Sequence, residues 1–112
     1  MNYLTKKTST QEFEAWVKAE RGDKYHDMLT YDIVALGGEV GEIQDAWKKA
    51  ARGSLSTNEL VEDILLESGD VLHYLVRLLQ DVGYSLQDAM DANVEKLENR
   101  KKYGKGKHGK RS

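Results

Sequence analysis

Residues 57–82 read TNELVEDILLESGDVLHYLVRLLQDV. Apolar side chains in this stretch recur at steps of three and four residues, which is the period of an α-helix. They form two stripes roughly 120° apart at about 100° per residue. The stripes are Leu60, Ile64, Val71, Leu75 and Leu78, and Leu65, Leu72, Val76 and Leu79. A helix that is apolar on two sides is covered on two sides, either within one bundle or, as we favour, partly by a second subunit.

Three further helices are predicted around this stretch. The spacing of apolar residues indicates helices over residues 10–20, 28–51 and 86–103. Capping signatures precede three of the four helices, namely Ser9 with Glu12, Ser56 or Thr57, and Ser85 with Asp88. The sequence contains no proline, which agrees with long uninterrupted helices. We therefore predict an all-α fold that resembles a four-helix bundle and assembles as an oligomer.

The composition excludes several classes of protein. A chain of 112 residues suits one domain, and 39% hydrophobic with 32% charged residues is typical of a globular protein. There is no run of 18 apolar residues and no apolar signal-peptide core, so we expect no membrane span and a cytoplasmic location. The absence of cysteine excludes disulfides, thiolate metal sites and cysteine nucleophiles.

The charge is divided unevenly along the chain. Residues 100–112 hold seven of the 17 basic residues and none of the 19 acidic ones, so residues 1–99 carry a net charge of −9. Residues 104–112 also lack apolar side chains. We expect one all-α domain over residues 1–103 and a basic, flexible tail over residues 104–112. An acidic body with a basic tail makes nucleic-acid binding an unlikely role and suggests a protein that holds cations together with phosphates.

Two pairs of acids are placed where each pair can present its carboxylates to one point. Glu39 and Glu42 are three residues apart on one predicted helix, and Glu67 and Asp70 are three apart on the next. Such pairs are usually solvated surface acids. Glu67, however, falls inside an apolar stripe, where an unpaired charge is costly and a divalent cation removes the cost. The oxygen-only donors favour Mg²⁺ or Mn²⁺ over iron, and no EF-hand loop is present.

Glycine is unusually frequent near the first acid pair. Gly37, Gly38 and Gly41 lie inside the predicted second helix, although each destabilises a helix by about 0.5–1 kcal/mol relative to alanine. We expect another helix or a ligand to approach closely here.

The predicted fourth helix supplies the opposite charge. Asn93, Lys96 and Arg100 share one of its faces, and Tyr103 follows. Lysine and arginine on such a face can bind phosphate oxygens, although an ordinary charged helix surface has the same pattern.

The ordered set of motifs resembles the MazG-like family of all-α nucleoside triphosphate pyrophosphohydrolases. The stretches are GEVGEI at residues 38–43, LESGDV at residues 66–71 and NVEKLENRKKY at residues 93–103. The family pattern is E-E-x-x-E followed by E-x-x-D, and Gly38 replaces its first glutamate. The resemblance implies hydrolysis of a (d)NTP to a (d)NMP and diphosphate, with two or more Mg²⁺ ions (Mn²⁺ as an alternative) at each site.

The resemblance also implies roles for individual residues and for the assembly. Glu39, Glu42, Glu67 and Asp70 would bind the metals and act in catalysis, while Asn93, Lys96, Arg100, Tyr103 and Trp16 would bind the substrate. Trp47 lies on an apolar stripe, so we interpret it as a core residue. Similar proteins form homodimers or dimers of dimers with sites between subunits. Some small forms belong to bacteriophages, and if this chain is phage-encoded, its cytoplasmic location would be that of a bacterial host cell. Among bases we lean to a purine, with (d)GTP first.

Two alternatives remain open at this point. A related all-α enzyme would hydrolyse dUTP or phosphoribosyl-ATP instead. A helical interaction module without activity would carry the same acids for structural reasons.

Overall fold

The computed structural model describes residues 3–22 and 28–104. These residues form four helices and no strand. The helices are α1 (Thr10–Arg21), α2 (Leu29–Ala51), α3 (Thr57–Asp81) and α4 (Leu86–Tyr103). The all-α class and the approximate helix limits predicted from the sequence are confirmed. Of the expected tail over residues 104–112, only Gly104 is among the described residues. No described helix has the length and apolar character needed to cross a membrane.

Each predicted serine cap closes a reciprocal capping box. The hydroxyls of Ser9, Ser56 and Ser85 each accept a hydrogen bond from the backbone N–H three residues on, and the acid at that position accepts one from the serine N–H. Every box therefore satisfies two N–H groups that have no partner inside the helix. These caps fix where α1, α3 and α4 begin.

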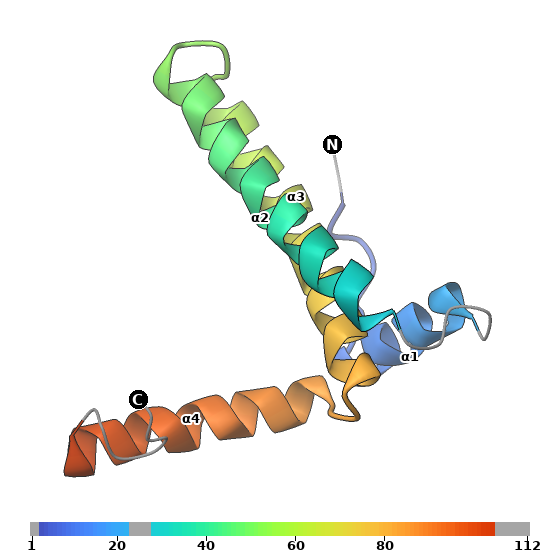
Figure 1. Ribbon diagram of the computed structural model, residues 1–112. Helices are drawn as coiled ribbons and strands as arrows, with labels where there is room; N and C mark the ends of the chain where they lie inside the picture. Colours follow the sequence, from blue (N-terminus) through green and yellow to red (C-terminus); the bar gives the residue numbers. More distant parts are fainter. Residues whose placement is uncertain (1–2, 23–27, 105–112) are drawn as a thin grey trace.

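An antiparallel hairpin of α2 and α3 forms the body of the molecule, and α1 packs against the end of α3 (Figure 1). The chain turns between α2 and α3 at Gly53, whose φ of 87° is a conformation that glycine adopts without strain. The fully buried apolar side chains are Val17 of α1 and Val76 of α3, with Ala46 of α2 nearly buried. The hydrophobic core of a single chain is therefore small.

A buried cluster of charges connects the first three helices. Arg21 of α1 forms ion pairs with Asp32 of α2, at 3.8 Å, and with Asp81 of α3. Arg77 of α3 places its Nε 3.0 Å from an Asp32 carboxylate oxygen. Asp32 is fully buried, and the Asp81 side chain nearly so. Two acids and two guanidinium groups thus compensate one another where the three helices meet.

Helix α4 leads away from this body rather than packing along it (Figure 1). Apolar side chains on several helices stay exposed as a result. Examples are Val94 on α4, which is 61% exposed, Leu65 on α3, which is 47% exposed, and Ile33 on α2, which is 52% exposed. A single chain therefore does not cover both stripes of α3, which supports the expectation that something else does.

The structure bears on two sequence expectations about packing, and it corrects the one for Trp47. Trp47 is 63% exposed, so it is not a core residue of a single chain. The C-terminal end of α2 lies beyond the part of the hairpin that α1 reaches (Figure 1). At Gly37, Gly38 and Gly41 a Cβ atom would meet no atom of the described residues within 4 Å, so the close approach of a ligand or of a helix from a second copy stays a prediction. The space over this face of α2 is open.

Candidate active site

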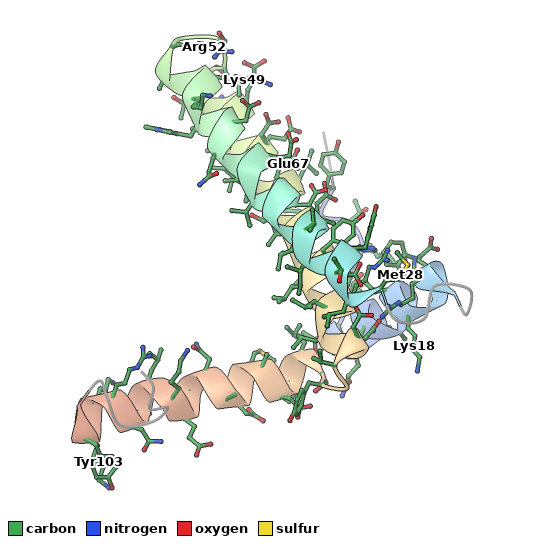
Figure 2. The ribbon with its side chains drawn as sticks, in the orientation of Figure 1. Lys18, Met28, Lys49, Arg52, Glu67 and Tyr103 are labelled. Carbon is green, nitrogen blue, oxygen red and sulfur yellow. The ribbon has the colours of Figure 1, made fainter. Side chains whose placement is uncertain are left out.

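Three acids from the two hairpin helices gather at one point. Carboxylate oxygens of Glu39 on α2 and of Glu67 and Asp70 on α3 all lie within 4.8 Å of one another. Glu67 occupies the middle of the hairpin (Figure 2). The i, i+3 spacing puts Glu67 and Asp70 on neighbouring turns, and the antiparallel pairing of α2 with α3 brings Glu39 opposite them.

The acids of this cluster affect one another's protonation. Partial burial and the nearby Asp70 carboxylate raise the pKa of Glu67 and also the pKa of Glu39 above the ordinary value. Neighbouring Glu42 adds to both effects. Among the residues that the structure describes, no Lys or Arg shifts either pKa, so this part of the chain gathers negative charge here without a balancing side chain.

The remaining acids named from the sequence take different positions. Glu42 is exposed and lies outside the group of three, although its charge reaches both Glu39 and Glu67. Glu67 is half-buried, so the expectation of a carboxylate enclosed by apolar side chains is corrected for a single chain. Asp45, a further acid of α2, forms an ion pair of 3.1 Å with Lys49, and this ion pair lowers the pKa of Asp45.

The donor atoms of the cluster fit a hard divalent cation. Carboxylate oxygen is the preferred protein ligand of Mg²⁺ and Mn²⁺, and three such groups from two rigid helices can share one or more ions. The half-exposed position leaves room for water and phosphate oxygens to complete the coordination. Close acids also repel one another, and bound cations relieve that repulsion.

An aromatic group lies beside the acids where α1 meets α3. The rings of Phe13 and Trp16 stack with centroids 6.1 Å apart, and His73 meets the edge of Trp16 at 5.7 Å. His73 is one helical turn beyond Asp70, and its pKa is lowered by burial and by Arg77. Trp16 is 51% exposed and lines a pocket of about 490 Å³ with Phe13 and Lys6. The sequence assignment of Trp16 to a binding surface is therefore compatible with its position.

Sequence reasoning missed two tyrosines near the acids. Arg77 lies 5.8 Å from the ring centroid of Tyr31 and 5.3 Å from that of Tyr74. Burial and a hydrogen bond with Tyr31 raise the pKa of Tyr74, and the charge of Glu39 contributes. Tyr74 follows Asp70 by four residues, so its place on the same helix face was available as a signal.

The basic face of α4 is not brought to the acids of the same chain. Asn93 and Lys96 are exposed, Arg100 is half-buried, and Tyr103 is 56% exposed. Figure 2 shows Tyr103 at the far end of α4, well away from Glu67 on the hairpin. The predicted basic half of the site and its acidic half are therefore separate within one chain.

Comparison with known families agrees with the motifs and the fold. The sequence model of the MazG nucleotide pyrophosphohydrolase domain matches residues 30–104, which is more than half of the chain. The match includes α2, α3 and α4, with all three acids of the cluster, and begins after α1. No curated protein and no solved structure matches the chain.

Proposed function

The chain belongs to the MazG nucleotide pyrophosphohydrolase family, and from this premise we propose that it is a Mg²⁺-dependent nucleoside triphosphate pyrophosphohydrolase. The reaction converts a (d)NTP and water to a (d)NMP and diphosphate by cleaving the bond between the α and β phosphates. The observation that carries the proposal is the cluster of Glu39, Glu67 and Asp70, whose carboxylate oxygens all lie within 4.8 Å of one another.

The acids hold the metal in this proposal. Glu39, Glu67 and Asp70 bind the Mg²⁺ ions directly, and Glu42 joins them through its exposed carboxylate. Bound Mg²⁺, two or more ions per site, supplies charge neutralisation of the triphosphate and a water of lowered pKa, and Mn²⁺ can replace it. A glutamate of this set takes the proton of the attacking water.

The phosphate chain needs basic groups that the acids cannot provide. We propose that Lys96 and Arg100 hold the departing diphosphate, with Asn93 and Tyr103 beside them. Because α4 leads away from the acids of its own chain, these residues reach a site on a second copy. The protein then acts as a homodimer or homotetramer, and the exposed apolar side chains of α2, α3 and α4 provide its interfaces.

We propose that the nucleobase of the substrate binds in the aromatic pocket of α1. His73 connects Trp16 and Phe13 to the helix turn that carries Asp70, so the pocket lies within reach of a nucleotide whose phosphates meet the acids. Its volume of about 490 Å³ is in the range of small-ligand sites. Stacking on Trp16 suits any base, and a purine offers the larger face, so (d)GTP is our first candidate. We place the activity in the cytoplasm, where these substrates are made.

A nucleotide panel tests the proposed reaction. We incubate the protein with each of the common dNTPs and NTPs, with dUTP and with phosphoribosyl-ATP, in Mg²⁺ and in EDTA, and separate the products by anion-exchange chromatography. The proposal requires a monophosphate and diphosphate that appear only with the metal. Formation of a nucleoside diphosphate and inorganic phosphate would contradict cleavage at the α–β bond.

The same panel separates the alternatives. Hydrolysis of dUTP or phosphoribosyl-ATP alone would assign the protein to a different substrate of the same chemistry. No turnover of any nucleotide, together with an unfolding temperature that Mg²⁺ does not change, would favour an interaction module.

A further inference from the structure

Helix α4 is tied to the rest of the molecule through a side chain of α1. The Glu14 carboxylate Oε2 accepts a hydrogen bond of 2.6 Å from the backbone N–H of Leu86, the first residue of α4. The bond is partly buried and joins positions 72 residues apart. Contacts of α4 with the other helices are sparse, so this bond adds a tertiary restraint to the turn that joins α4 to the end of α3.

Glu14 is itself held by the end of α3. The side-chain amide of Gln80 donates a hydrogen bond of 3.1 Å to the Glu14 carbonyl oxygen. Arg21 lies about two helical turns beyond Glu14 on α1. It donates a hydrogen bond of 3.3 Å to the Arg77 carbonyl oxygen and forms an ion pair with the nearly buried Asp81. These bonds fix α1 on α3, so the Glu14 carboxylate projects from a platform that does not belong to α4.

The chemistry of the bond suits a positioning role. The N-terminus of a helix carries partial positive charge and unsatisfied N–H groups, both of which attract a carboxylate. Asp88 meets part of this need from within α4, because its Oδ2 accepts from the Ser85 N–H at 2.9 Å. An acid within α4 moves with the helix and cannot orient it, whereas Glu14 belongs to another helix and can.

We propose that Glu14 is a positioning residue that sets the direction of α4 relative to the hairpin. The consequence for function rests on the proposed role of Lys96 and Arg100 as phosphate ligands. Arg100 lies 14 residues beyond Leu86, which is about 21 Å along a helix at 1.5 Å per residue. A rotation of roughly 20° at Leu86 would therefore displace Arg100 by about 7 Å, more than a hydrogen bond to phosphate tolerates.

The direction of α4 can be measured without any enzymatic activity. The chain has no cysteine, so a pair of spin labels can be placed by substituting exposed Asn58 at the start of α3 and exposed Glu95 on α4. Double electron–electron resonance then gives the distribution of distances between the labels. Dilution with unlabelled protein suppresses distances between copies.

Two variants of Glu14 separate the loss of its hydrogen-bond acceptor from the loss of its negative charge. Glu14→Ala removes the acceptor and is expected to broaden the distance distribution, while Glu14→Gln keeps a neutral acceptor and should broaden it less. Glu20→Gln, an exposed acid of the same helix, is the control and should leave it as narrow as in the parent. Unchanged distributions in Glu14→Ala and Glu14→Gln would overturn the proposal, and Glu14→Gln alone decides it if Glu14→Ala does not fold.

Kinetics test the functional half separately. Misdirected α4 should raise KM for the triphosphate several-fold and leave kcat within about twofold, because the acids and their metal are untouched. A broadened distance distribution with an unchanged KM in an active enzyme would show that the direction of α4 does not serve phosphate binding. An inactive parent protein would instead refute the proposed function, while the distance measurement on Glu14 would still stand.

Discussion

Glu67 is the residue at which electrostatic repulsion and the proposed metal binding are most directly linked. It lies half-buried between Asp70 and Glu39, and its pKa is raised by that burial and by the neighbouring acids. The free protein therefore keeps mutually repelling charges together, an arrangement that is explained when a cation binds them. The same carboxylate that weakens the metal-free fold would make the metal-bound form more stable.

Glu67→Gln is predicted to remove both effects. Without metal the variant should unfold at a higher temperature than the parent, because one repelling charge is gone. It should lose the stabilisation that Mg²⁺ gives the parent, and its turnover should fall by about a hundredfold or more. Thermal unfolding with and without Mg²⁺, followed by diphosphate release, measures all three.

The matched control is Glu62→Gln, an acid of the same helix outside the cluster. It should keep the Mg²⁺-dependent rise in unfolding temperature and the parent activity. An equal loss in Glu62→Gln would mean that the effect of Glu67→Gln reflects the overall charge of α3 and not a metal site.

Asp32, in the buried charge cluster, makes the stability of the fold depend on pH. Burial and the adjacent Asp81 carboxylate raise its pKa to about 6, although Arg77 and Arg21 oppose the shift. The folded protein therefore holds a proton that the unfolded chain has lost between about pH 4 and pH 6. This group's contribution to stability is present below pH 4 and is lost as the pH rises towards 6.

Asp32→Asn is predicted to cancel that loss. The free energy of unfolding of the parent should fall relative to Asp32→Asn between pH 4 and pH 7, by on the order of 1–3 kcal/mol. Urea unfolding of both proteins at a series of pH values measures the difference. A difference that does not vary with pH would show that Asp32 has no raised pKa.

At the level of helices, the sequence was sufficient to predict where each one begins and ends. The predicted caps at Ser9, Ser56 and Ser85 all form, because a cap depends on residues three positions apart and needs no distant partner. The meeting of Glu39 with Glu67 and Asp70 was also predictable, since a short loop makes α2 and α3 antiparallel neighbours.

The path of α4 was beyond sequence reasoning for a physical reason. Its direction depends on the turn after α3 and on the bond from Glu14 to Leu86, and a contact between residues 72 apart leaves no periodic signal. For the same reason the buried cluster of Arg21, Asp32 and Asp81 was missed, because its members read separately as ordinary charged residues. Trp47 was misassigned because an apolar stripe shows that a face is to be covered and not which chain covers it.

The basic face of α4 is predicted to act on phosphate binding. Lys96→Ala and Arg100→Ala should each lower kcat/KM by about tenfold to a hundredfold, since each removes a charge-assisted hydrogen bond to the substrate. Lys101→Ala is the charge-matched control, because Lys101 is exposed on the same helix and pairs with Glu98 at 3.4 Å. Steady-state kinetics on the best nucleotide of the panel gives the comparison, and equal losses in all three variants would indicate a general effect of charge.

For the whole molecule, the separation of acids from basic residues makes a prediction about assembly. If one copy supplies Glu67 and another supplies Arg100, a mixture of Glu67→Gln and Arg100→Ala proteins contains some sites with both residues intact. Refolding the two impaired variants together should then give more activity than the sum of the two variants refolded separately. Sedimentation of the parent should show a dimer or tetramer, and a monomer with full activity would exclude sites shared between copies.

The proposed activity depends most on three converging acids that bind divalent cations, which in turn bind a triphosphate. An anomalous difference map from a crystal grown with Mn²⁺ and a triphosphate whose α–β bridge cannot be hydrolysed tests this directly. We predict Mn²⁺ peaks in contact with Glu39, Glu67 and Asp70 and with phosphate oxygens of the nucleotide. A nucleotide bound with its Mn²⁺ away from all three carboxylates would contradict the claim.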